Sequence, residues 1–296
     1  MTVGSEVPLA DSRNIPALLA TLRTQQRSCT VLVTGTPGGS IHVRDGLVVA
    51  METPGAPGIE GLLLRSGRIG EPEWSAVRAS DTSHEHLAAE LVNSGLVGAG
   101  ELEVISLSAL FDAAFALSLA VPDSWEVADP VPTLYRNAGV TPERLLGEVS
   151  RRINLLAGEP GSVAALARTR MRQVSTADLT GTVDRLPARH QDVLAATDGR
   201  RTARDIAFAL GRGLFAVMLD LRHLLDRGLV RPHAPATDRR PSTAARIAPS
   251  RTGPSPAAPG SATPSAVAPS ALDSVSLSLP RRFPGRNSAP TPRPHD

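Results

Sequence analysis

The chain has 296 residues, a formal net charge of +2, no lysine and one cysteine. Without lysine it cannot use a P-loop lysine, a Schiff base or a lysine general base, and one cysteine excludes an internal disulfide and any multi-cysteine metal centre. The net charge is −7 over residues 1–125, +4 over 126–232 and +5 over 233–296, which indicates either different partners for the two halves or two ordinary solvated surfaces.

The first predicted elements are a short amphipathic helix over residues 15–27 and a small antiparallel meander. Two β-branched and apolar segments, 30–35 and 40–51, are separated by a Thr-Pro-Gly-Gly turn, which is typical of a hairpin. The Asp-Gly pair at 45–46 predicts a second turn within the later segment. Cys29 precedes the first strand, so we interpret it as a small buried residue rather than a reactive thiol.

An internal repeat with an offset of 28 residues follows, in which residues 63–70 align with 91–98. In each copy a helix ends at a glycine, Gly67 or Gly95, that can adopt the left-handed conformation of a helix C-terminus. A solenoid needs about three or more repeats, so these two copies predict two successive helical hairpins. The second copy continues into an apolar helix over 107–119, and a short strand is expected near residues 125–127.

A connecting helix is predicted over residues 142–157, because Thr141-Pro142-Glu143 has the residue types of a helix N-terminus. Its arginines at 151 and 152 fall away from the apolar stripe. The stripe could pack within the chain, which we favour, or form the seam of a homodimer. It consists of Leu145, Val149, Ile153 and Leu156.

Residues 185–232 predict a winged helix. Three short helices are expected, with a tight Gly-Arg-Gly turn at 211–213 between the second and third, and a closing strand begins at 229–230. Residues 233–296 contain thirteen prolines among Ser, Ala, Thr and Arg, and this composition predicts a disordered tail.

The predicted class is therefore α+β: a small antiparallel sheet with helical hairpins, then a winged helix, then a disordered tail. The expected divisions, in chain order, are an interaction domain at 1–128, a linker carrying the connecting helix at 129–184, a winged-helix domain at 185–232 and the tail at 233–296.

The first 125 residues resemble the PatA-like N-terminal domain of bacterial signalling proteins. The resemblance rests on four segments: the leucine-rich first helix, the strand pair with its Asp45-Gly46 turn, and the two helix ends at Gly67 and Gly95. It implies a regulatory, protein-binding domain without known catalytic residues. Residues 185–232 resemble winged-helix domains of transcriptional regulators, on the segments 198–207 and 224–230.

The sequence offers no recognisable catalytic or cofactor-binding motif, so we expect a protein that is not an enzyme, with no cofactor and no metal. The Gly-rich segment 34–39 lacks a following lysine and precedes a strand, so it is interpreted as a turn. His84-Glu85-His86 is the only close histidine pair, and histidines two apart do not share a helix face.

The sharpest functional hypothesis is contact with DNA through arginines near the second helix of the winged-helix unit and the turn that follows it. The start of the third helix, residues 214–217, holds no polar side chain, so any DNA contact should be mostly to the backbone. The candidate phosphate-contacting residues are Arg200, Arg201, Arg204 and Arg212.

Two hypotheses stay open. The first is a transcription-linked regulator in which the acidic domain binds a protein partner and the winged helix touches DNA. The second is a signalling adaptor whose two domains both bind proteins. The sequence has no apolar run long enough for a membrane span and no secretory signal at its start, so we expect a cytoplasmic protein that binds no membrane.

Overall fold

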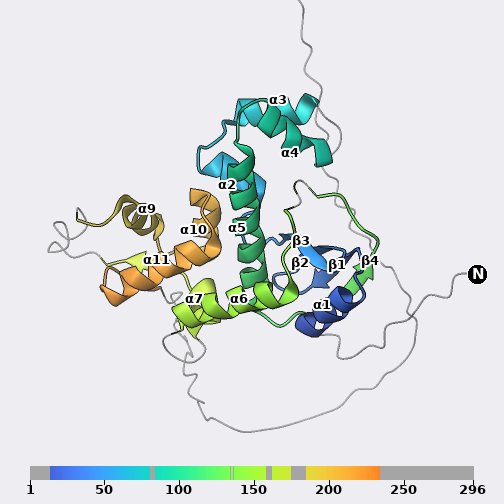
Figure 1. Ribbon diagram of the computed structural model, residues 1–296. Helices are drawn as coiled ribbons and strands as arrows, with labels where there is room; N and C mark the ends of the chain where they lie inside the picture. Colours follow the sequence, from blue (N-terminus) through green and yellow to red (C-terminus); the bar gives the residue numbers. More distant parts are fainter. Residues whose placement is uncertain are drawn as a thin grey trace, which may run out of the picture. The chain divides into compact units, whose positions relative to one another are not determined.

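The computed structural model describes residues 14–80, 84–133, 135, 137–157, 162–174 and 185–233, all of which belong to one unit. It has the mixed α+β fold that the sequence predicts (Figure 1). All of the predicted tail except His233 lies outside the described residues. The domain boundaries at 128 and 185 stay predictions.

The first half begins with a helix and an antiparallel sheet (Figure 1). The sheet has the strand order β3-β2-β1-β4, in which every neighbouring pair is antiparallel. These elements are α1 (Ile15–Thr24), β1 (Cys29–Thr34), β2 (Gly39–Arg44), β3 (Leu47–Glu52) and β4 (Ser124–Ala128).

The predicted meander is confirmed. Asp45 and Gly46 both have positive φ, of 49° and 72°, as the tight β2–β3 turn requires. The short strand expected near residue 125 is β4, which pairs with β1 so that Val31 faces Val127. Leucines of α1 cover the core face of the sheet, where the buried side chains of Val31 and Ile41 lie.

The predicted helical repeat is also confirmed at its two helix ends. Gly67 and Gly95 have φ of 73° and 71°, and the apolar residue two positions later folds back in both copies. The amide of Ile69 donates to the Leu63 carbonyl at 3.2 Å, and that of Val97 to the Leu91 carbonyl at 3.2 Å. The helices are α2 (Ile59–Arg65), α3 (Glu71–Ser80), α4 (His84–Asn93) and α5 (Ala99–Ser118).

Helix α5 links three hydrophobic clusters along its length, and in Figure 1 it stands between the sheet and the later helices. Leu102 packs among α2, α3 and α4, Leu110 packs under the sheet, and Phe115 packs with the last three helices. Successive turns of this helix therefore serve different cores. This explains why the apolar residues of 107–119 are not confined to one side.

The connecting helix is α6 (Pro142–Leu156), and the Thr141 side chain caps it by accepting the Arg144 amide at 3.3 Å. Its apolar stripe packs within the chain, as favoured from the sequence. Leu145 and Val149 join the cluster under the sheet, and Leu156 joins the cluster of the later helices.

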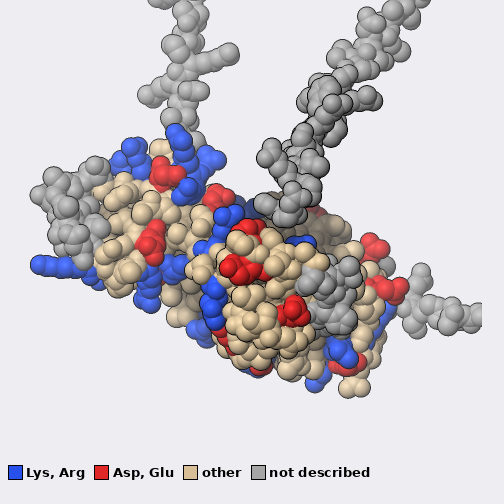
Figure 2. Space-filling view, turned by 90° about the horizontal axis from the view of Figure 1, so that it is seen from above, with Lys and Arg blue, Asp and Glu red and all other residues tan. Residues whose placement is uncertain are grey.

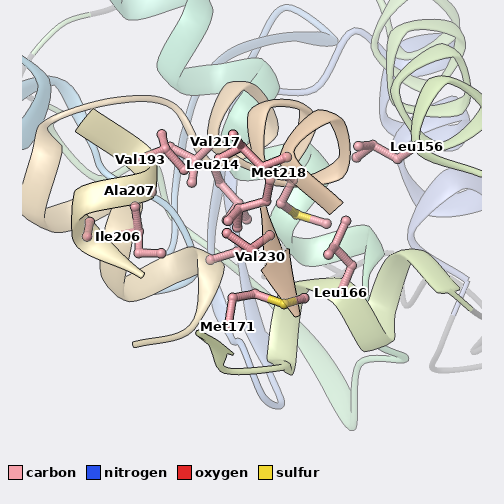
Figure 3. Close-up of a cluster of buried hydrophobic side chains, with 14 of the residues drawn as sticks. Leu156, Leu166, Met171, Val193, Ile206, Ala207, Leu214, Val217, Met218 and Val230 are labelled. Atoms are coloured by element: carbon pink, nitrogen blue, oxygen red, sulfur yellow. The ribbon is translucent and has the colours of Figure 1, made fainter. Parts of the chain in front are cut away.

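The last helices surround one of the three hydrophobic clusters, which also includes Phe115 of α5 and Leu156 of α6 and is partly labelled in Figure 3. Met218 and Val217 of the third helix are fully buried at its centre. Helix α7 and strand β5 were not predicted from the sequence. The elements are α7 (Ser162–Arg168), β5 (Met171–Gln173), α9 (Ala188–Ala196), α10 (Ala203–Leu210), α11 (Leu214–Asp226) and β6 (Val230–Pro232).

Strand β6 pairs antiparallel with β5, which precedes the three helices in the chain. Within the described residues, the partner strand of β6 therefore comes from the segment before α9, and β6 does not form a hairpin with a later strand. Helix α4 begins at His84, so the histidine pair lies at a helix start.

Candidate nucleic-acid interface

Three of the four predicted arginines lie exposed around the start of α10. Arg200 and Arg201 occupy the turn between α9 and α10, and Arg204 lies in the first turn of α10. Asp198 shapes this turn by accepting the backbone amides of Arg200 at 2.8 Å and Arg201 at 3.1 Å. These amides, that of Arg200 first, hold the pKa of the Asp198 carboxyl below its usual range.

The start of α10 is fixed by a capping box between Thr202 and Asp205. The Asp205 amide donates to the Thr202 hydroxyl at 3.3 Å, and the Thr202 amide donates to the Asp205 carboxylate at 2.9 Å. The Arg204 guanidinium lies 5.8 Å from the centre of the Phe208 ring. The arginines are therefore presented to solvent by a helix start whose geometry is fixed by its own side chains.

Arg212 is placed differently from the other three. Its guanidinium donates to the buried Asp220 carboxylate at 2.5 Å and to the Arg189 carbonyl at 3.0 Å. His190 Nε2 lies 3.0 Å from the same carboxylate, and its ring stacks on His223. Arg212 thus connects the turn before α11 to both α9 and α11, and the Asp220 carboxylate balances its charge.

The first turn of α11, which in a helix-turn-helix reader contacts base edges, is covered by the first half of the chain. Its N-cap residue, Gly213, has no side chain, and Asp112 of α5 takes the capping role. Asp112 Oδ1 accepts the Phe215 amide at 3.3 Å. A Cβ on Gly213 would lie 2.6 Å from Asp112 Oδ2, so the two elements meet without intervening space.

Arg152 of α6 completes this junction. Its Nη1 donates to Asp112 Oδ1 at 2.7 Å, and its guanidinium lies 4.9 Å from the centre of the Phe215 ring. Burial raises the pKa of the Asp112 carboxyl, and this effect is only partly offset by Arg152 and by the amides at the start of α11. Three helices far apart in sequence therefore share one buried ion pair.

The turn before α11 is covered as well. Gly211 has φ of 60°, and a Cβ there would lie 2.4 Å from the backbone nitrogen of Ser66 and 2.5 Å from the Arg65 carbonyl carbon. The glycine thus permits direct backbone contact between the end of α10 and the end of α2. The start of α11 and the turn before it therefore contact α2, α5 and α6.

A cavity of about 340 Å³ lies elsewhere, between β3 and helices α2 to α5. Several polar groups in its wall are engaged with neighbours: Trp74 Nε1 donates to Glu60 at 3.1 Å, and Arg78 lies 3.7 Å from the same carboxylate. The Ser106 hydroxyl donates to the Glu103 carbonyl at 2.8 Å. Among the described residues, no three His, Cys, Asp or Glu side chains are grouped as a metal site.

Sequence reasoning missed Asp112 and Arg152. Asp112 is the acidic residue inside the apolar segment 107–119, and a carboxylate in such a position needs a buried partner. That signal was available in the sequence. Arg152 carried no such signal, because its position away from the apolar stripe of α6 also fits a solvated face.

Compared with protein-family models, curated proteins and solved structures, the chain matches none. No helix within the described parts of the chain is long and apolar enough to cross a membrane.

Proposed function

We propose that this chain is a non-enzymatic, transcription-linked regulatory protein. Its winged-helix unit contacts the phosphate backbone of DNA and does not read base edges. The observation that carries the proposal is the contrast between two parts of that unit. Arg200, Arg201 and Arg204 are exposed at the start of α10, whereas the first turn of α11 is covered by α5 and α6. Arginine side chains that reach solvent from a well-fixed helix start suit phosphate contacts, which position a protein without carrying sequence information.

Charge supports the same assignment. The described segments 162–174 and 185–233 contain twelve arginines and five acidic residues. In Figure 2 arginine side chains crowd the left-hand part of the molecule, which in Figure 1 holds α9, α10 and α11. A positive surface of this kind attracts DNA through release of its counterions.

The N-terminal half is proposed as the part that binds a protein partner in the cytoplasm. Several large apolar side chains stand exposed there, with Val104 at 64% and Val121 at 70% exposure, while the net charge of residues 1–125 is −7. An acidic surface repels DNA, so the two halves are suited to different partners.

The test is binding of the full chain to a labelled duplex of about 20 base pairs at about 50 and about 200 mM salt. We expect affinity that is independent of sequence and falls steeply with salt. The variant R200A/R201A should bind more weakly and depend less on salt. A variant with the same loss of charge in the N-terminal half, R27A/R44A, should bind like the wild type.

The adaptor hypothesis predicts the opposite result. If the full chain shows no salt-sensitive binding to any duplex, the DNA assignment fails and a protein-docking role for the winged helix takes its place. Affinity that changes strongly between unrelated sequences would also contradict the proposal, because it would require base contacts.

A further inference from the structure

The small sheet of the winged-helix unit carries arginines outside the predicted set. Strand β5 lies in its middle, with β6 on one side and residues 197–199 on the other. The Gly199 amide donates to the Met171 carbonyl at 2.9 Å, and the His233 amide donates to the Arg170 carbonyl at 2.8 Å. Residues from three separate parts of the chain thereby become neighbours.

The alternation of side chains along a strand places these arginines on the outer face. Met171 and Val230 are buried in the core shown in Figure 3, so the residues next to them, Arg172 and Arg231, point away from it. Arg172 and Arg231 stand directly opposite each other in the β5–β6 ladder. Arg170, which precedes Met171, is also exposed.

A pair of like charges directly opposite each other in a sheet destabilises it. No carboxylate within the described residues forms an ion pair with Arg172 or Arg231. The nearest strand neighbour that is acidic, Asp198, is already engaged with the amides of Arg200 and Arg201 and lies 3.8 Å from the Arg201 guanidinium. Five arginines and one carboxylate, Asp198, lie on or beside this sheet, so its outer face keeps a net positive charge.

We propose that this face is a second phosphate-binding surface, which holds the backbone of a nucleic acid together with the turn before α10. This inference rests on the proposed function and extends the contact surface from α10 to the sheet. We call the set the arginine sheet; its members are Arg170, Arg172, Arg200, Arg201 and Arg231.

The spread and chemistry of the arginine sheet favour a nucleic-acid backbone over other anions. Its guanidinium groups come from two strands, the residue before β5 and a turn, so one small anion cannot engage them all, whereas a chain of phosphates can. The planar guanidinium donates two parallel hydrogen bonds to a phosphate. A membrane-binding face needs exposed apolar side chains beside its basic ones, and the exposed positions of β5 and β6 hold Arg172, Gln173, Arg231 and Pro232.

The experiment compares the full-length variant R172T/R231T with the wild type on the same labelled duplex, over a series of salt concentrations. Threonine keeps the strand, and circular dichroism and thermal unfolding check that the variant is folded. We expect the affinity to fall at least about tenfold, and the slope of log affinity against log salt to decrease by about two, as loss of two phosphate contacts predicts. The variant R172K/R231K, which keeps both charges, should retain the slope.

Each other outcome has a distinct meaning. If the wild type binds DNA and R172T/R231T binds with unchanged affinity and slope, the arginine sheet is not part of the contact, although the proposed function stands. If the wild type does not bind DNA, both fail. Binding of the wild type to vesicles of anionic lipid or to polyglutamate, but not to DNA, would show that the surface serves another polyanion and would also overturn the inference.

Discussion

Asp112 of α5 and Arg152 of α6 meet at the start of α11, with 2.7 Å between Oδ1 and Nη1, although the two residues are 40 positions apart in the chain. The pair is largely buried, with side-chain exposures of 6% and 12%. Asp112 caps α11, whose first residue is Leu214. Helices α5, α6 and α11 therefore meet at one buried polar junction, beside the apolar contacts of Phe115 with the last helices.

Removing Asp112 should destabilise the protein strongly. In D112A the Arg152 guanidinium keeps only Glu148 as an ion-pair partner and α11 loses its cap, so we expect the free energy of unfolding to fall by about 2–4 kcal/mol. Urea denaturation of the full chain measures this. D112N can still accept the Phe215 amide and should lose less. The double variant D112L/R152M should be more stable than D112A, because no buried charge is left unpaired; a result no better than D112A would contradict this account of the pair.

Gly211 and Gly228 form a matched pair for testing the contact between α10 and α2. Both have positive φ, of 60° and 67°, but a Cβ on Gly211 would strike the backbone of Arg65 and Ser66 whereas Gly228 faces open space. We expect G228A to lower the free energy of unfolding by about 1 kcal/mol through backbone strain alone. G211A should lose at least about 2 kcal/mol more because of the collision. Equal losses in the two variants would mean that the contact is not formed in solution.

Glu148 should make the protein sensitive to acid. Hydrogen bonds from Arg151, and then from Arg152, lower its pKa from 4.5 to about 2. Because the folded-state pKa lies below the unfolded one, the stabilisation is complete above about pH 4.5 and is lost as the pH falls toward about 2. In E148Q this part of the pH dependence of the unfolding free energy should disappear, whereas E143Q on the same helix should keep it. Identical curves for the wild type and E148Q would refute the assignment.

Cys29 should be protected in the native protein. Its side chain is 2% exposed, and burial raises the pKa of its thiol, which disfavours the reactive thiolate. A thiol reagent at neutral pH should modify the folded chain slowly and the urea-unfolded chain rapidly. Rapid modification of the folded chain would show that β1 opens readily at its first residue.

Local preferences in the amino-acid sequence are enough to specify many of the separate elements, although not α7 or β5. The Asp45-Gly46 turn, the helix ends at Gly67 and Gly95, and the Thr141 cap follow from side-chain and backbone preferences that act over a few residues. For the same reason, the exposed arginines at the start of α10 could be named from the sequence, because a polar turn followed by a helix cap places them near the surface.

How these elements meet follows only from their packing in three dimensions. The covering of the first turn of α11 depends on Asp112 and Arg152, and the arginine sheet depends on strand β5, whose three residues give no periodic signal of their own. Pairing between distant segments leaves no local pattern in the sequence, because its energy comes from surfaces that exist only after folding. The availability of each arginine for a partner is therefore set by packing, which ties Arg212 to Asp220 and leaves Arg172 beside Arg231.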